Sequence, residues 1–219
     1  KAVWRKSPGA TILGPLLNRQ IADHFCMGPT HIGVNENAID DVKTELEQVL
    51  RLMQLACLHN KAIEQKTWVA IRHEMLKNNP EVEFTKACAR RFMALLSNTT
   101  GLGKLLRRLH EMKVLRKIIP EFEHARGLLQ FNQYHKYTVD EHSMRALENV
   151  TSFEEQKTDV GSAYRSVRDK HLLHLALLLQ DLGTGFDEDH SEVGRRIAAA
   201  TGERFGLGED DTETIKFLV

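Results

Sequence analysis

The stretch that decides the fold reads HLLHLALLLQDLGTG and covers residues 171–185. Its apolar residues predict a helix over 171–179, and the run 183–185 predicts a turn. Gln180 and Asp181 stand between the two. A carboxylate at the C-terminal end of a helix is unfavourable against the helix dipole unless a cation or a donor compensates it. Asp181 therefore indicates a functional role.

Apolar residues with three- and four-residue spacing continue the helical pattern on both sides of this stretch. A polar connector is expected over 151–159, and proline at position 120 should interrupt the chain because it lacks an N–H and has a fixed φ. We expect helices over 39–55, 68–76, 87–96, 102–115, a short turn ending at 129, then 140–147, 171–179, about 187–202 and from about 210 onward.

The first 36 residues differ from the rest because proline and glycine break any regular pattern. Residues 31–34 are typical of one strand, with a partner expected around 24–27. The sequence thus predicts a mainly α fold, a helical bundle with a small N-terminal β element.

Composition excludes several classes of protein. Thirty basic and thirty acidic residues cancel, so no whole-chain field attracts the protein to nucleic acid or to an anionic membrane. No apolar run approaches the roughly 20 residues that a membrane span needs. Three cysteines without paired spacing indicate reduced thiols. We therefore expect a cytoplasmic protein with no nucleic-acid or membrane partner.

Three side chains in the second half have the types and spacing of a metal site. His142 precedes Asp181 by 39 residues, and His190 stands near the start of the next expected helix. Imidazole and carboxylate ligands suit Mn, Fe, Zn or Mg, and such a metal polarises a phosphoryl oxygen and lowers the pKa of bound water. The sequence therefore predicts a divalent metal held by His142, Asp181 and His190.

The same stretches resemble the HD metal-phosphohydrolase superfamily, and most closely its uridylyl-removing branch, which is part of the bifunctional uridylyltransferase that modifies the nitrogen-signalling protein PII. The resemblance extends from about residue 16 onward. The matching stretches are 23–41, 92–96, 102–106, 114–122, YHKYTVDEH (134–142), LALLLQDLGTG (175–185) and DHSEVG (189–194).

The resemblance implies hydrolysis of a phosphodiester, with removal of UMP from a modified tyrosine on a PII-type partner. Asp181 would be the catalytic residue and would bind the metal together with His142 and His190. His135 and Thr184 would lie in the pocket. The resemblance divides the chain into an N-terminal β tail of an upstream domain (1–36), a helical linker bundle (37–119) and a C-terminally truncated HD-type domain (120–219).

Two positions depart from the family pattern. The family's histidine before Asp181 is Gln180 here, and the usual lysine is Thr184. A glutamine offers an amide oxygen but lacks the basic nitrogen of imidazole, so we expect metal affinity to fall steeply. Gln180 thus marks a degenerate ligand position.

Two further interpretations stay open. The chain could be a degenerate HD domain kept as a regulatory or binding module, which the changes on either side of Asp181 motivate. It could also be a nucleotide phosphohydrolase of another HD branch, which would act on free nucleotides. The match over 134–142 favours the uridylyl-removing branch over the latter.

Overall fold

The N-terminal part of the chain forms a small sheet in the computed structural model, which describes residues 19–77, 82–129 and 137–219. The strands β1 (Arg19–Ala22), β2 (Phe25–Met27), β3 (His31–Val34) and β4 (Ala62–Ile63) follow one another in the sheet. β2 pairs antiparallel with β3, and Phe25 lies opposite Val34. The predicted pair of strands at 24–27 and 31–34 is therefore confirmed.

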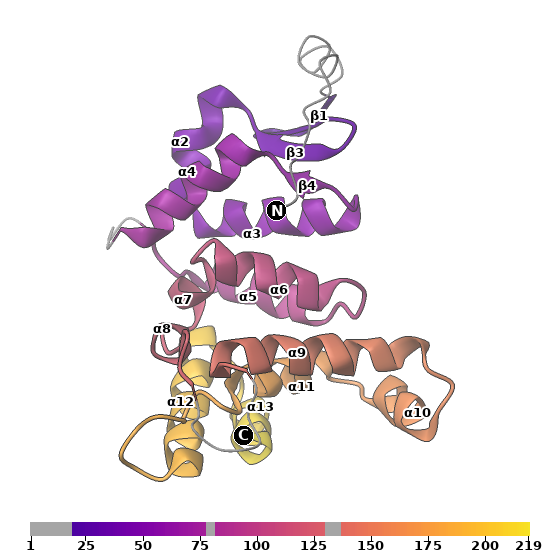
Figure 1. The fold of residues 1–219 in the computed structure, drawn as a ribbon, viewed down its shortest axis with the longest axis vertical. Coiled ribbons are helices and arrows are strands. Elements are labelled where there is room, and N and C mark those ends of the chain that lie inside the picture. Colours follow the sequence, from indigo (N-terminus) through magenta and orange to yellow (C-terminus); the bar gives the residue numbers. More distant parts are fainter. Residues whose placement is uncertain (1–18, 78–81, 130–136) are drawn as a thin grey trace.

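Helices α2 (Ile39–Thr44), α3 (Leu46–Leu58) and α4 (Gln65–Leu76) lie beside the sheet (Figure 1). A single helix over 39–55 was expected, and this prediction is wrong in one respect. Glu45 is extended, with φ −90° and ψ 100°, and separates α2 from α3. Val42 in α2 and Leu46 in α3 are both buried. The apolar spacing continues across the break, so the spacing does not reveal it.

The middle of the molecule consists of α5 (Lys86–Leu96) and α6 (Leu102–Glu111), which lie between α3 and α9 in Figure 1. Thr85 caps α5 by accepting a hydrogen bond from the backbone N–H of Cys88 at 3.2 Å. The helix expected over 102–115 ends earlier, because Lys113 adopts a left-handed conformation with φ 66°. Two short helices then follow, α7 (Leu115–Ile118) and α8 (Phe122–Ala125), on either side of the proline at position 120.

The remaining helices form the third part of the fold. They are α9 (Val139–Ser152), α10 (Asp159–Ser166), α11 (Lys170–Leu179), α12 (His190–Phe205) and α13 (Glu209–Leu218), with a 3-10 turn at Phe153–Glu155 (η2) after α9. Another 3-10 turn, η1 (Glu36–Ala38), precedes α2 in the N-terminal part. Figure 1 shows α10 on an arm beyond the end of α9. α10 was not predicted. Only Gly161 and Tyr164 of this helix are buried, so it has no apolar stripe to detect.

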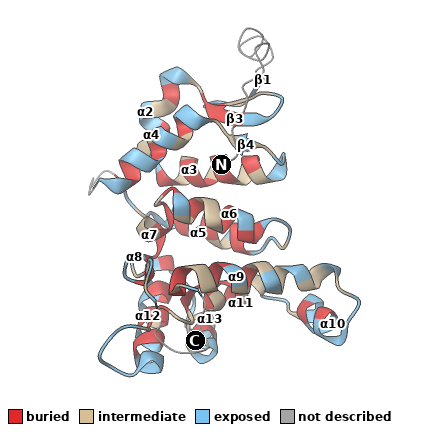
Figure 2. Cartoon of the chain, viewed as in Figure 1, coloured by how far each residue is buried: buried red, intermediate tan, exposed pale blue. Residues whose placement is uncertain are grey.

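The buried side chains form one hydrophobic cluster that extends from Phe25 in the sheet to Ile215 in α13. Figure 2 shows buried positions along the inner sides of all three parts of the fold. The mainly α fold with a small N-terminal β element is thus confirmed. None of the helices in the described ranges is long and apolar enough to cross a membrane.

Candidate active site

The centre of the candidate site is a contact between α9 and α11. His142 lies in the first turn of α9, and its Nδ1 is 2.6 Å from Oδ2 of Asp181. Both side chains are partly exposed, by 43% and 30%. An ionised carboxylate only accepts hydrogen bonds, so Nδ1 of His142 carries the hydrogen. In the neutral ring this leaves the lone pair on Nε2, the nitrogen that is then able to accept a proton or bind a metal.

Gln180 interacts with the same carboxylate oxygen. Its side-chain Nε2 donates to Oδ2 of Asp181 at 3.3 Å. The residue still has helical φ and ψ, and its backbone N–H donates to the carbonyl of Ala176. Gln180 thus presents its amide N–H to Asp181, and in this arrangement it acts as a donor and not as a metal ligand.

The turn after Asp181 packs tightly against the start of α12. A Cβ at Gly183 would lie 2.2 Å from the carbonyl oxygen of His190 and 2.8 Å from the backbone nitrogen of Gly194. Both are backbone atoms, so only a glycine fits without moving α12. The turn itself is closed by a hydrogen bond from the N–H of Thr184 to the carbonyl of Asp181 at 3.1 Å.

His190 is exposed and begins α12. The helix is capped by Asp189, whose side chain accepts from the N–H groups of Ser191 and Glu192 at 3.0 and 3.2 Å. Across residues 19–77, 82–129 and 137–219, no three His, Cys, Asp or Glu side chains are grouped so that they could hold a metal ion. The structure therefore brings together two of the three predicted ligands, His142 and Asp181. The role of His190 stays a prediction.

Of the two predicted pocket residues, the structure describes only Thr184. Thr184 lies in the turn beside the site, and its carbonyl accepts from Nε2 of His124 at 3.3 Å. His124 also stacks on Phe186, with ring centroids 4.2 Å apart. These contacts tie the turn to α8. His135 lies outside the described residues.

A buried polar group, which no sequence pattern predicts, adjoins the site. Asp140, in the first turn of α9, accepts from Nε2 of His110 at 2.9 Å and from the N–H of Gly127 at 3.3 Å. Burial alone would raise the pKa of Asp140, but the hydrogen bonds from His110, Thr138 and Gly127 outweigh it and hold that pKa well below its usual range. No motif connects residues 110, 127 and 140, so sequence gave no signal for this contact.

His174 is a core histidine and not a candidate ligand. It is fully buried in α11, with Nδ1 2.6 Å from the carbonyl of Leu96 and Nε2 2.8 Å from the hydroxyl of Tyr164. The carbonyl only accepts, so Nδ1 carries the hydrogen and Nε2 accepts from Tyr164. Burial lowers the pKa of His174 and raises that of Tyr164 to about 12. The pair links α10 and α5 to α11.

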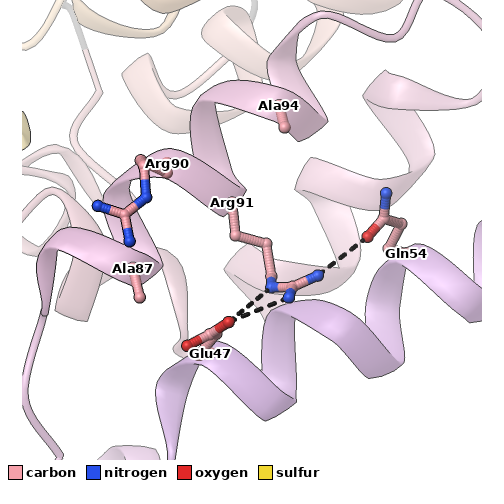
Figure 3. A pocket seen from close by; sticks show the side chains of 6 residues that line it. All are labelled: Glu47, Gln54, Ala87, Arg90, Arg91 and Ala94. Atoms are coloured by element: carbon pink, nitrogen blue, oxygen red, sulfur yellow. Dashed lines mark hydrogen bonds and ion pairs between the residues drawn. The ribbon is translucent and has the colours of Figure 1, made fainter. Parts of the chain in front are cut away.

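A pocket elsewhere on the surface contains none of the predicted site residues. It lies between α3 and α5, where Arg91 donates to Glu47 at 3.0 Å and to Gln54 at 3.4 Å (Figure 3). Glu47 and Gln54 thus both accept hydrogen bonds from the guanidinium of Arg91. The pocket is therefore held by its own ion pair.

The residues present fit a divalent metal only in part. Metal–ligand bonds of about 2.0–2.2 Å place two ligand atoms roughly 3 Å apart. The 2.6 Å separation of His142 Nδ1 and Asp181 Oδ2 instead fits a shared hydrogen. Gln180 turns its N–H and not its oxygen toward this pair. In the described part of the chain, the third and fourth ligands of a closed metal site are not gathered around Asp181.

Fold and site together define a mainly α protein with a histidine–carboxylate pair at the junction of two helices. No family model matches the chain. The chain is 39% identical over 139 residues, 61% of its length, to a bifunctional uridylyltransferase/uridylyl-removing enzyme of Ruegeria pomeroyi. It is 37% identical over 144 residues, 64% of its length, to the enzyme of the same name from Cereibacter sphaeroides.

These similarities confirm the predicted resemblance: the chain is homologous to a region of bifunctional uridylyltransferase/uridylyl-removing enzymes. The matched region is only a part of the relatives, since it covers 15% and 16% of their lengths.

Proposed function

We propose that this chain is the central and HD region of a uridylyl-removing protein, with a hydrolytic site that Gln180 impairs. The substrate would be a PII-type protein carrying UMP on a tyrosine, in the cytoplasm. The homology to bifunctional uridylyltransferase/uridylyl-removing enzymes supports this choice of reaction. The observation that carries it is the contact of His142 with Asp181 at the end of the apolar helix α11.

The reaction is the hydrolysis of one phosphodiester bond. Water adds to phosphorus, the bond between phosphorus and the tyrosyl oxygen breaks, and the tyrosine recovers a proton while UMP is released. Asp181 accepts from Nδ1 of His142 and so fixes the tautomer in which Nε2 carries the lone pair. His142 can then hold a proton of the water. A bound divalent metal would polarise the phosphoryl oxygen and lower the pKa of the water.

Gln180 weakens this site in two ways. It replaces an imidazole nitrogen by an amide, which is a poor ligand for transition metals. It also donates to the Asp181 oxygen that His142 uses, and thereby draws charge from the carboxylate. We therefore expect slow hydrolysis by this chain.

The same contact supports a second candidate function, that of a degenerate HD domain serving as a regulatory or binding module. His142 and Gln180 both donate hydrogen bonds to the same oxygen of Asp181. Such a domain would bind a nucleotide or a uridylylated partner without turning it over.

Release of UMP from uridylylated PII distinguishes the two candidates. The 219-residue chain is compared with Gln180→His and Asp181→Asn variants at equal manganese concentration. We expect slow release by the unmodified chain, release faster by about tenfold or more in Gln180→His, and none in Asp181→Asn. Saturable binding of uridylylated PII without release in any variant would favour the degenerate module.

A further inference from the structure

Asp140 is the buried charge closest in sequence to the candidate site. It lies two residues before His142, in the same helical turn, and is only 8% exposed. A buried carboxylate is costly unless donors compensate it. Here the donors come from three places: Nε2 of His110 in the last turn of α6, the N–H of Gly127 after α8, and the side chain of Thr138.

The other ring nitrogen of His110, Nδ1, also has a hydrogen-bond partner. Arg126 Nη2 donates to His110 Nδ1 at 3.4 Å and to the His110 carbonyl at 3.1 Å. Arginine has no acceptor, so Nδ1 of His110 accepts and Nε2 carries the hydrogen that it donates to Asp140. Arg126 therefore donates to His110, and His110 in turn donates to Asp140.

The network reaches the start of α9, where His142 lies. Thr138 precedes α9 and its side chain makes no capping bond to the helix N–H groups. The first turn is instead tied from outside: Val139 N–H donates to the Leu128 carbonyl at 3.0 Å, and Asp140 bonds to His110 and Gly127. His142 N–H donates to the Thr138 carbonyl at 2.8 Å within this turn.

We propose that Asp140 is a positioning residue: its hydrogen bonds to His110 and Gly127 fix the first turn of α9 so that Nδ1 of His142 meets Asp181. The inference rests on the proposed function in taking the contact of His142 with Asp181 as the reaction centre. Asp140 touches neither of these two side chains in the contacts described above and acts through the helix backbone.

The tautomer of His142 tests the proposal without any turnover. Long-range ¹H–¹⁵N NMR of the 219-residue chain at about pH 8, where an ordinary histidine is neutral, reads which ring nitrogen carries the hydrogen. We expect the Nδ1–H form in the unmodified chain and loss of most of it in Asp140→Asn. The asparagine replaces one of the two acceptor oxygens by a donor, which then opposes the N–H group either of Gly127 or of His110.

Two sets of variants serve as controls. Glu148→Gln changes a carboxylate on the same helix, one that bonds to Arg107, and should leave the His142 tautomer unchanged. His110→Gln keeps an N–H near the position of Nε2 and should retain more of the Nδ1–H form than His110→Ala. A lower melting temperature in Asp140→Asn with an unchanged His142 tautomer would overturn the proposal and leave Asp140 with a purely structural role.

The outcome is independent of the proposed reaction. If no variant releases UMP but Asp140→Asn alters the His142 ring, the positioning role stands and the hydrolase proposal fails. If the unmodified chain releases UMP and the His142 ring is the same in Asp140→Asn, the hydrolase proposal stands and the positioning role of Asp140 fails.

Discussion

The side-chain nitrogen of Gln180 lies 3.3 Å from Oδ2 of Asp181 and donates to it. A metal ligand at position 180 would have to direct a lone pair toward the space that Asp181 faces. The amide instead directs N–H hydrogens to the carboxylate, and the oxygen it contacts is the one that also bonds to His142. The departure from the family pattern at position 180 is thus matched by a change in the direction of its hydrogen bonding.

Replacement of Gly183 by alanine should displace α12. The added Cβ would lie 2.2 Å from the His190 carbonyl oxygen, and backbone cannot move as a flexible side chain can. We expect a loss of about 1–3 kcal/mol in the free energy of unfolding, the usual cost of overpacking, measured by urea denaturation. Gly208→Ala is the matched control, because nothing lies within 4 Å of a Cβ there. Equal stability of both variants would show that α12 does not press on this turn.

Replacement of His174 by phenylalanine should leave the carbonyl of Leu96 and the hydroxyl of Tyr164 without their buried partner. Unsatisfied buried groups cost about 1–3 kcal/mol each, so a drop of that size or more is expected in urea denaturation. Tyr164→Phe removes only one of the two hydrogen bonds and should cost less. A larger loss in Tyr164→Phe than in His174→Phe would contradict this account.

His174 should also make stability depend on pH. Burial lowers its pKa in the folded state, whereas the unfolded chain has an ordinary histidine value of about 6.5. Below that value the unfolded state binds more protons, so this part of the stability is present above about pH 6.5 and is lost as the pH falls toward the folded-state pKa. Denaturation midpoints between pH 7 and 5 should fall more steeply for the unmodified chain than for His174→Gln. Parallel slopes would assign the acid sensitivity to other groups.

The ion pairs between α6 and α9 should contribute modestly. Arg107 contacts Glu141 at 2.6 Å and Glu148 at 3.2 Å, and all three side chains are about one-third exposed. Solvent screens such pairs, so Arg107→Ala should cost about 1 kcal/mol or less beyond the loss of packing, and less at high salt. Arg196→Ala, at an exposed pair with Glu188, is the comparison and should have no measurable effect. A salt-independent loss in Arg107→Ala would point to packing alone.

Much of the fold could be predicted because apolar periodicity is local. The helices over 86–96, 170–179 and 190–205 follow from spacing and capping residues that lie within a few positions of one another. The break at Glu45 was invisible, since the apolar spacing runs through it, and α10 was missed because it buries too little. These features depend on tertiary packing, which local spacing does not encode.

The candidate site, like the fold, could be predicted only in part. His142 and Asp181 were singled out by motif, and the structure brings them together. The bond of Asp140 to His110 joins residues 30 positions apart on different helices, without any pattern in the chain. The orientation of the Gln180 amide likewise depends on the three-dimensional position of Asp181 and His142.

The central claim, that Gln180 weakens metal binding at this site, is tested most directly by the metal content of the purified chain. Elemental mass spectrometry is applied after manganese loading and desalting to the unmodified chain and to Gln180→His. Disturbing even an outer partner of a ligand weakens binding about 10–100-fold, so we predict roughly a tenth of an equivalent or less in the unmodified chain. The variant should retain close to one equivalent. Near-stoichiometric metal in the unmodified chain, or none in the variant, would contradict the account.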